Sequence, residues 1–343
     1  MKVLLVKMSS LGDVVHALPG VTDAARHGVR FDWVVEEDFA DIPALHPAVE
    51  EVIPIAWRRW RTSAWRSRSE MRTFLSLLRA RHYDLILDTQ GLIKSGVVAR
   101  FARGAIRAGY DGQSARESMA TCFYNRRFNV PTGTHAVVRQ RELFATALGY
   151  LANGIPEFGL EVPSERVEDQ VVLAHGTTWE SKEWPEPMWI ELAQSMRSEG
   201  LRPVLPWGDD EEYARAERIA LRSRAEILPR TNVGGLVKLL AGAGAVIGVD
   251  SGLTHLAGAL GTPTVVVYGA TDARLTGARG AGVRNLSSTL ECAPCLRRTC
   301  SHGGAALIRN GAPVTPACFA SVAPERVWQT LQELMNAPRI LHL

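Results

Sequence analysis

A carboxylate that follows the first apolar run of the chain could act in acid–base chemistry. The segment Lys7-Met8-Ser9-Ser10-Leu11-Gly12-Asp13 comes after the apolar residues 3–6 and before residues 14–21, whose apolar positions recur at helical spacing. This order predicts a buried strand, a tight turn and the start of a helix, and ligands of open α/β sheets bind at such turns. Asp13 is therefore a candidate catalytic base, although an aspartate in a first helical turn can also simply stabilise the helix.

A second strand-to-helix turn lies in the other half of the chain. The apolar residues 246–249 run into Asp250-Ser251-Gly252-Leu253-Thr254-His255, which predicts a turn of small residues and then a helix. Free amides at the start of a helix bind phosphate without a positive side chain. Asp250 could then accept hydrogen bonds from sugar hydroxyls while the amides of Ser251, Gly252 and Leu253 hold a diphosphate. The alternative is an ordinary capped helix with a satisfied His255.

Two further polar groups follow apolar runs in the same half. His175-Gly176-Thr177-Thr178 precedes Lys182, and hydroxyls with a lysine suit an anionic leaving group because the ammonium is a point charge that matches phosphate oxygens. Glu212 follows Trp207-Gly208 at the start of a predicted helix, where its carboxylate could bind a ribose diol. The competing interpretations are a solvated surface lysine and a glutamate that only stabilises its helix.

The elements that must position these residues alternate between strands and helices. Apolar runs predict strands near 3–6, 31–35, 52–55, 85–87, 171–174, 203–205, 245–249 and 264–267. Helical spacing predicts helices near 13–26, 69–82, 92–103, 136–148, 187–199, 210–222, 233–242, 252–260 and 324–335. Such alternation indicates parallel, doubly wound sheets, and the proline-containing stretch around 154–163 predicts a linker between two of them, with a cleft between the halves.

Composition supports two globular domains. The length of 343 residues fits two domains, and 46% hydrophobic residues is typical of a globular protein. No stretch approaches the ~20 apolar residues of a membrane span, and the first residues lack a secretory pattern, so we expect a cytoplasmic protein. A net charge of +3 is too small to indicate general nucleic-acid binding. A basic cluster nevertheless suits an anionic partner or membrane surface: Arg58, Arg59, Arg61, Arg66, Arg68 and Arg72.

Most of the cysteines fall in one late segment rich in glycine and proline. Cys292-Ala-Pro-Cys295 has the spacing of a zinc knuckle or a redox pair, and Cys300 and Cys318 follow it. The second half of the segment lacks a matching close pair, and thiols of a cytosolic chain stay reduced. A structural loop is therefore favoured over a metal site. Cys122 lies apart in a predicted helix and is expected to be a small core residue.

At these residues the chain resembles the lipopolysaccharide heptosyltransferases, and among them most of all the type I branch. The segments that carry the resemblance are residues 7–13, 31–37, 58–61, 88–95, 124–126, 206–208 and 250–255. The resemblance implies the GT-B fold, with two Rossmann-like doubly wound α/β domains facing across a cleft and a C-terminal helix closing back. The domains implied are an acceptor-binding domain at 1–155, an ADP-heptose-binding domain at 156–323, and a C-terminal helix and tail at 324–343.

The resemblance also implies an activity. Members of this branch transfer L-glycero-D-manno-heptose from ADP-heptose to the inner Kdo of Kdo2-lipid A, with inversion, so we expect peripheral contact with the cytoplasmic face of the inner membrane and no nucleic-acid partner. Two departures keep the type II branch open, which adds the second heptose. The cysteine segment is more similar to other heptosyltransferase branches, including the type II enzymes, and Thr62 stands where type I relatives can carry a further basic residue.

The resemblance assigns roles to residues of this sequence. Asp13 matches the catalytic base, and Asp250 matches the residue that binds heptose hydroxyls. The other donor positions are Thr177, Thr178 and Lys182 for the diphosphate, Glu212 for the ribose, and Ser251, Gly252, Leu253 and His255 for the phosphate-binding turn. The positions that meet Kdo carboxylates and lipid A phosphates are Ser10, Gly12, Arg58, Arg61, Arg116, His135 and Arg139.

The chemistry implied is direct displacement, which needs a base and a stabilised leaving group. Asp13 would be a weak base at the ordinary aspartate pKa of ~4 unless domain closure desolvates it. Because Lys182 and helix amides can neutralise the departing ADP, we expect no divalent metal and no cofactor besides the donor substrate.

Two other classes of protein compete with this interpretation. A nicotinamide-dependent oxidoreductase is disfavoured, since the first turn lacks Gly-x-Gly-x-x-Gly. A non-catalytic module that binds anionic lipid would use the same arginines but would not need Asp13.

Overall fold

The computed structural model describes residues 1–62 and 67–336, and it divides the chain into two compact units at Glu161/Val162. The sequence placed this boundary six residues earlier, after 155. The stretch before Glu161 belongs to the first unit because its backbone is bonded there: the Glu161 amide donates to the Leu45 carbonyl at 3.2 Å. Arg66 and the tail at 337–343 lie outside the described residues.

The first unit is built on one parallel sheet with the strand order β3-β2-β1-β5-β7-β8. Its strands are β1 Lys2–Val6, β2 Arg30–Glu36, β3 Val49–Ile55, β5 Leu85–Asp88, β7 Arg107–Tyr110 and β8 Arg126–Phe128, and a small separate pair joins β4 His82–Tyr83 to β6 Arg103–Gly104. Its helices are α1 Leu11–Ala25, α2 Trp57–Thr62, α3 Arg68–Leu78, α4 Ile93–Phe101 and α5 Ala136–Leu148.

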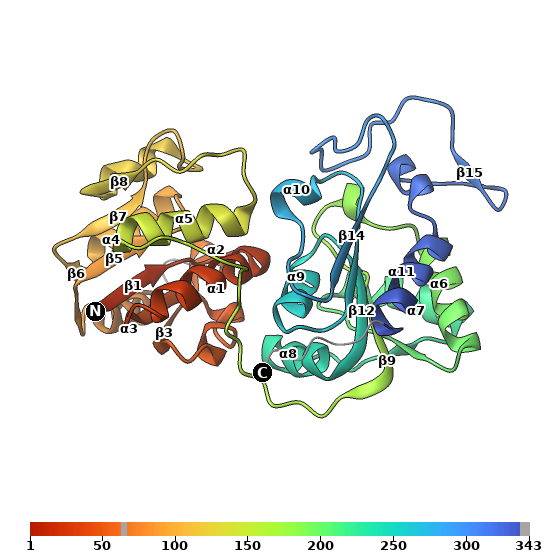
Figure 1. The fold of residues 1–343 in the computed structure, drawn as a ribbon, viewed down its shortest axis with the longest axis horizontal. Helices are drawn as coiled ribbons and strands as arrows, with labels where there is room; N and C mark the ends of the chain where they lie inside the picture. Colours follow the sequence, from red (N-terminus) through yellow and green to blue (C-terminus); the bar gives the residue numbers. More distant parts are fainter. Residues whose placement is uncertain (63–66, 337–343) are drawn as a thin grey trace. The chain divides into compact units, whose positions relative to one another are not determined.

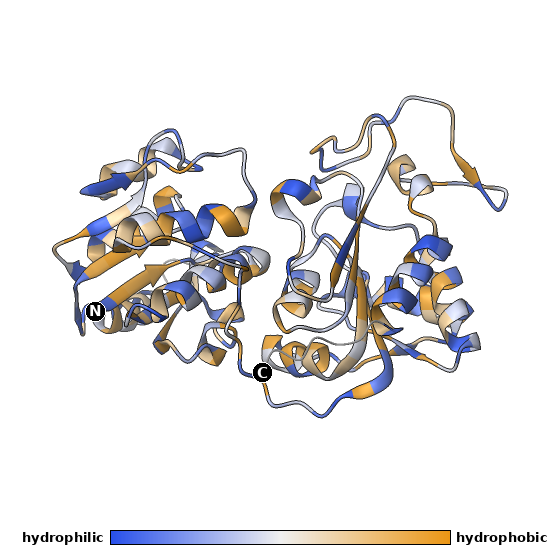
Figure 2. Cartoon of the chain, viewed as in Figure 1, coloured by the Kyte–Doolittle hydropathy of each residue, from blue (hydrophilic) through white to orange (hydrophobic). Residues whose placement is uncertain are grey.

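Burial explains why the central strands of this sheet are continuous apolar runs. Residues 3–6 of β1 are fully buried, as expected for a parallel strand covered by helices on both faces. Helices α1 and α5 pack closely on one another, and Gly20 permits the contact, since a Cβ there would lie 2.5 Å from the ring of Phe144. The hydrophobic colour of the strands in Figure 2 follows the same pattern in both units.

The second unit repeats this plan, with the strand order β11-β10-β9-β12-β13-β14 and parallel pairing throughout. Its strands are β9 Val167–Ala174, β10 Arg202–Leu205, β11 Glu226–Ile227, β12 Ala243–Val249, β13 Thr264–Tyr268 and β14 Val283–Ser287. Its helices are α6 Glu186–Ser198, α7 Asp210–Ser223, α8 Val233–Gly242, α9 Gly252–Ala259, α10 Ala273–Thr276 and α11 Pro324–Asn336. In Figure 1, α8 and α9 lie on one side of this sheet and α6, α7 and α11 on the other.

Both sheets therefore have the dinucleotide-fold order 3-2-1-4-5-6 when the strands of each sheet are counted along the chain. The order reverses between β1 and β5 in the first unit and between β9 and β12 in the second. Ligands of such sheets bind outside the carboxyl ends of the strands at this reversal, which is the switch point. The loops that follow these strands carry Asp13 and Asp250, so the predicted α/β architecture places the candidate residues where ligands bind.

The closing helix α11 belongs to the second unit, whereas the sequence had set it apart from 324 onward. It packs against α6 and against strands β12 and β13, and Val327 and Leu331 are fully buried there. Just before it, the indole nitrogen of Trp184 donates to the Val322 carbonyl at 3.1 Å. This hydrogen bond and the buried apolar face hold α11 to the body of the unit.

Candidate active site

Asp13 lies in the first turn of α1, at the switch point of the first unit. Its Oδ2 accepts hydrogen bonds from the backbone nitrogen and the hydroxyl of Ser10, both at 3.0 Å. Its Oδ1 lies 3.6 Å from the ammonium of Lys7, a residue at the end of β1 that is 4% exposed. The carboxylate thus stabilises the helix start, as one interpretation of the sequence required, and its side chain also keeps 33% of its surface exposed for a substrate.

The surroundings of Asp13 keep this carboxylate ionised. Burial alone would raise its pKa, but the charges of Lys7 and His16 and the hydrogen bonds from Ser10 outweigh burial and lower the pKa to about 2. The sequence predicted a base of ordinary strength that closure must activate. In the structure the Asp13 carboxylate is ionised and can accept a proton, but it is a weaker base than an ordinary aspartate, because the buried ammonium of Lys7 lies beside it.

The loop after β5 packs directly beside the loop after β1. The side-chain oxygen of Gln90 accepts from the amides of Met8 at 2.6 Å and Ser9 at 3.3 Å. The Ser9 hydroxyl in turn accepts from the ammonium of Lys94, at 3.2 Å, on the first turn of α4. These bonds fix the loop that carries Asp13 and bring a second cation, Lys94, to its edge.

Two of the predicted acceptor arginines, Arg58 and Arg61, lie on α2 near this edge. Their charges act on Lys94, whose pKa is lowered first by burial and then by these two guanidinium groups. Both arginines are exposed, and Arg58 approaches Asp38 no closer than 3.9 Å. The backbone nitrogen of Arg58 donates at 2.8 Å to Glu36, a 1% exposed residue at the end of β2 that sequence reasoning assigned no role. Buried Glu36 therefore holds α2 in place and leaves the guanidinium groups available to anions.

The other predicted acceptor residues differ in availability. Arg139 is committed to the fold, since its guanidinium donates to the carbonyls of Pro131 at 3.0 Å and Ser114 at 2.9 Å. His135 is 5% exposed and caps α5, accepting from the Val137 amide through Nδ1. Arg116 is exposed beside the loop after β5. Ser10 and Gly12 come shortly before Asp13 in the sequence, so these two predicted residues lie in the same site as Asp13.

The second unit gathers its predicted residues more tightly. Asp250, which is 6% exposed, follows β12, and its Oδ2 lies 2.7 Å from the ammonium of Lys182. Its Oδ1 lies 3.3 Å from His255 Nε2 on α9, and its backbone carbonyl accepts from the Thr177 hydroxyl at 3.2 Å. Lys182 is 16% exposed and paired, so it is not a solvated surface lysine. The loops after β9 and β12 meet in this cluster.

Charge pairing fixes the ionisation of Asp250. Burial would raise its pKa, but His255 and Lys182 together hold it well below the ordinary range. Helix α9 starts at Gly252 with Ser251 as its N-cap, and the buried Ser251 hydroxyl has no hydrogen-bond partner among the described residues. A helix start, an ammonium and a spare hydroxyl are the groups that bind a phosphate.

Glu212 forms a separate subsite beside the loop after β9. Its Oε2 accepts from the Gly208 amide at 2.8 Å, and burial raises its pKa. The carboxylate lies against Gly176, where a Cβ would collide with it and displace the Glu212 side chain from its present position. Thr178 is exposed near the same loop. The carboxylate is thus positioned at the end of a strand, where a sugar diol could reach it.

Sequence reasoning missed two residues of this site. The hydroxyl of Thr271, in the loop after β13, donates to Asp250 Oδ2 at 2.7 Å. The ring of Trp179 lies under Lys182, with 4.6 Å between the ammonium and the ring centroid. The position of Thr271 just beyond a predicted strand could have identified it. Cys122 was wrongly placed in the core: it is exposed, because η3 Ser118–Phe123 turns Ala120 inward instead.

Within residues 1–62 and 67–336, no three His, Cys, Asp or Glu side chains are already arranged around one point as metal ligands. In the same part of the chain, no helix combines the length and the apolar character that crossing a membrane requires.

Comparison with known proteins agrees with this arrangement of sheets. Residues 71–306 match the profile of glycosyltransferase family 9 (heptosyltransferase). Lipopolysaccharide heptosyltransferase 1 of Pseudomonas aeruginosa is 46% identical, with 99% of this chain and 100% of that protein covered. The chain belongs to glycosyltransferase family 9. It is therefore a glycosyltransferase of the GT-B fold, and the nicotinamide-dependent oxidoreductase and the non-catalytic module are excluded.

Solved structures of heptosyltransferases support the same family assignment. Escherichia coli heptosyltransferase WaaC with ADP superposes with a TM-score of 0.83 at 38% identity, covering 97% of this chain and 100% of that one. The same enzyme with ADP-2-deoxy-2-fluoro heptose gives a TM-score of 0.79.

Proposed function

We propose that this family 9 enzyme transfers L-glycero-D-manno-heptose from ADP-heptose to the inner Kdo of Kdo2-lipid A, with inversion at the anomeric carbon, in lipopolysaccharide inner-core biosynthesis. The observation that carries the proposal is the cluster of Lys182, Asp250 and His255 at the start of α9. It supplies charge for a diphosphate and a carboxylate for sugar hydroxyls in a chain 46% identical to a lipopolysaccharide heptosyltransferase 1 along nearly its whole length.

The second unit binds the donor. Lys182 and the first amides of α9 neutralise the diphosphate, with the Ser251 hydroxyl and the threonines of the loop after β9 as additional donors. Asp250 is fixed by Thr271 and accepts hydrogen bonds from heptose hydroxyls when the diphosphate draws Lys182 toward itself. Glu212 accepts from the ribose diol.

The first unit binds the acceptor and supplies the base. A Kdo hydroxyl oxygen attacks the anomeric carbon, the bond from that carbon to the β-phosphate oxygen breaks, and its electron pair leaves with ADP. Asp13 accepts the proton of the attacking hydroxyl. Lys7 keeps Asp13 ionised beforehand, so no deprotonation step precedes attack. Because Lys182 and helix amides carry the charge of the leaving group, the displacement proceeds without a divalent metal at the reacting carbon.

The exposed arginines of α2 give the acceptor its affinity. Guanidinium groups pair with carboxylates and phosphates through parallel hydrogen bonds, and Kdo2-lipid A carries both anions. Arg58 and Arg61 are available for this, whereas Arg139 supports the loop that precedes α5. Such an acceptor keeps the enzyme at the cytoplasmic face of the inner membrane as a peripheral protein.

An ADP-release assay with ADP-heptose tests the proposal. Delipidated Kdo2-lipid A should support turnover, whereas the same acceptor already carrying one heptose should not. The opposite preference would assign the chain to type II chemistry.

Turnover should persist after brief EDTA treatment, and a strict requirement for added Mg²⁺ or Mn²⁺ would contradict the mechanism. Asp13→Ala should lose turnover while keeping donor affinity. If it keeps turnover instead, Asp13 is not the base.

A further inference from the structure

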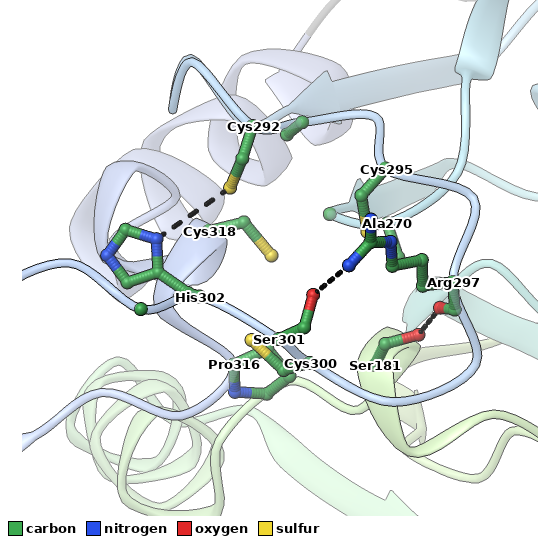
Figure 3. A pocket seen from close by; sticks show the side chains of 13 residues that line it. Ser181, Ala270, Cys292, Cys295, Arg297, Cys300, Ser301, His302, Pro316 and Cys318 are labelled. Carbon is green, nitrogen blue, oxygen red and sulfur yellow. Dashed lines mark hydrogen bonds between the residues drawn. The ribbon is translucent and has the colours of Figure 1, made fainter.

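A cavity of about 370 Å³ in the second unit is lined by thiols that the proposed reaction does not use. Cys292, Cys295, Cys300 and Cys318 all line it, together with His302 (Figure 3). The first three and the histidine come from the long segment between β14 and β15 Ile308–Arg309, and Cys318 comes from η5 Ala317–Ser321. Parts of the chain that are distant in sequence therefore bring soft ligands to one cavity.

One of these thiols has a histidine beside it. The sulfur of Cys292 lies 4.0 Å from Nδ1 of His302, within hydrogen-bond distance for a sulfur. Cys318 is 7% exposed and lines the same cavity as the other three cysteines.

Sequence reasoning favoured a structural loop over a metal site here, in part because the segment lacks a second close pair of cysteines. The fold removes that objection, since η5 brings Cys318 to the cavity. The remaining three thiols are exposed on loop residues, so rotation about their side-chain bonds can bring the sulfurs together without unfolding a helix or a strand. Among the described residues no ligand set is already assembled, so binding must complete the site.

We propose that Cys292, Cys295, Cys300 and Cys318 bind one thiophilic divalent cation of the Zn²⁺ class, with His302 as hydrogen-bond donor to the thiolate of Cys292. Thiolate ligands in a tetrahedral set select such a cation over Mg²⁺ or Ca²⁺. Each thiol releases its proton to solvent as its sulfur binds, and no electron is transferred. The cation is structural, because four thiolates leave no open coordination position for a substrate.

The site has a consequence for the donor-binding loop, because the cysteine segment is bonded to it. The hydroxyl of Ser181 donates to the Arg297 carbonyl at 2.5 Å, and the Ser181 amide donates to the Arg298 carbonyl at 3.1 Å. Ser181 precedes Lys182 in η4 Glu180–Lys182. The guanidinium of Arg298 also lies 5.6 Å from the centroid of the Trp179 ring, which Lys182 contacts as well.

The same segment reaches the loop that holds Asp250. The amide of Leu296, next to Cys295, donates to the Ala270 carbonyl at 2.8 Å. Ala270 precedes Thr271, whose hydroxyl donates to Asp250. A cation that orders residues 292–300 therefore positions both members of the Lys182–Asp250 pair. These cysteines are positioning residues, and this second part of the inference depends on the proposed function of the pair.

Metal analysis of the full-length protein tests the site. Protein that is purified under reducing conditions and loaded with Zn²⁺ should retain about one equivalent of Zn²⁺ after desalting, as measured by inductively coupled plasma mass spectrometry. Cys292→Ser/Cys295→Ser should retain none, and Cys122→Ser, which removes an exposed thiol outside the cavity, should retain the full amount. No retention by the unaltered protein, or equal retention by the double variant, would overturn the site. So would thiol mapping that finds the four cysteines joined as disulfides in the isolated protein.

Kinetics tests the positioning role, with circular dichroism to establish that each variant folds. The double variant should raise the KM for ADP-heptose about tenfold and leave kcat at saturating donor nearly unchanged, because the reacting groups remain. His302→Ala should bind Zn²⁺ more weakly and show a smaller rise in KM. An unchanged KM in a variant without metal would refute the positioning role. Failure of the proposed function is distinguishable, since Zn²⁺ retention needs no substrate and would persist in a chain that transfers no heptose.

Discussion

The two switch points of this molecule share a topology but differ in how their charges are paired. At the first, Asp13 is partly exposed, has one ammonium 3.6 Å away, and is bordered by arginines that face solvent. At the second, Asp250 is buried, and it contacts an ammonium at 2.7 Å, an imidazole at 3.3 Å and a hydroxyl at 2.7 Å. The charged groups of the first site are therefore available to a ligand, whereas those of the second site are already paired with one another.

This difference matches two kinds of ligand. A small, highly charged nucleotide sugar is bound most tightly by groups that are already fixed, because little side-chain entropy is lost on binding. A large lipid-linked acceptor needs exposed cations that can adapt to several anions, together with one carboxylate that stays ionised. The same strand order thus supports two recognition modes, because specificity resides in the loops after the strands.

The strongest test of the comparison removes the carboxylate of the first site. Asp13→Asn should lower kcat by about 10²–10⁴-fold, which is the usual contribution of a general base, while the KM for ADP-heptose stays the same. Steady-state ADP release at varied donor concentration measures both. Asp84→Asn is a matched control at the amino end of β5, away from the switch point. A large change in donor KM for Asp13→Asn would show that the two sites are not functionally distinct.

The second test breaks the internal pairing of the other site. Lys182→Met should lower kcat/KM by about 10²–10³-fold, since it removes charge from the leaving group. It should also destabilise the unit, because it removes a partner of buried Asp250. Lys182→Met/Asp250→Asn separates these effects: thermal unfolding should return toward that of the unaltered protein, while turnover stays low. Recovery of turnover together with stability would mean that Lys182 has a purely structural role.

Much of the fold was predictable because the central strands are fully buried. Strands β1, β5, β12 and β13 are apolar runs, and each was predicted within one or two residues of its observed bounds. Strand β9 begins four residues before its predicted start, because residues 168–170 are polar and give no apolar run. Strand β7 and the edge strands β8, β11 and β14 were missed, since they are short and contain polar residues that interrupt any apolar run. Helix α2 was missed as well, because six residues with three arginines give no apolar periodicity.

The site was predictable one residue at a time but not pair by pair. Asp13 and Asp250 stand just after apolar runs, and that position in a parallel sheet marks them. The contact of Lys182 with Asp250, and that of Lys7 with Asp13, depend on strand order and on side-chain direction, which no local pattern encodes. Thr271 also follows an apolar run, which could have marked it, but its hydrogen bond to Asp250, which follows the neighbouring strand β12, depends on strand order as well.

The third test concerns the exposed arginines of α2. Arg58→Ala and Arg61→Ala should each raise the KM for the Kdo acceptor about tenfold, with a smaller effect at high salt, since screening weakens exposed charge pairs. Arg59→Ala is the matched control, because the Arg59 guanidinium is bonded to Glu37 at 3.1 Å and to Glu70 at 2.8 Å. Equal effects of all three variants would indicate a general loss of positive charge instead of specific acceptor contacts.

The smallest expected effect isolates the cation beside the base. In the unaltered protein the pKa of Asp13 is about 2, so this group should cause no acid limb in kcat/KM above about pH 4. Lys7→Met keeps the buried length of the side chain but removes a charge that opposes burial, so the pKa of Asp13 rises and an acid limb in kcat/KM should appear at a higher pH than in the unaltered protein. Lys238→Met, on the exposed side of α8, controls for net charge.

Stability should fall as the pKa of Asp13 rises. A depressed pKa stabilises the fold above the unfolded value of ~4, and that contribution is lost as the pH falls toward about 2. In Lys7→Met the pKa of Asp13 moves back toward or above the unfolded value, so the gain in stability between pH 3 and pH 5 should shrink, which thermal melts across that range measure. An unshifted acid limb together with an unshifted melting profile would mean that Ser10 and His16 hold Asp13 ionised without Lys7. Of the two switch points, only the second would then depend on a buried lysine.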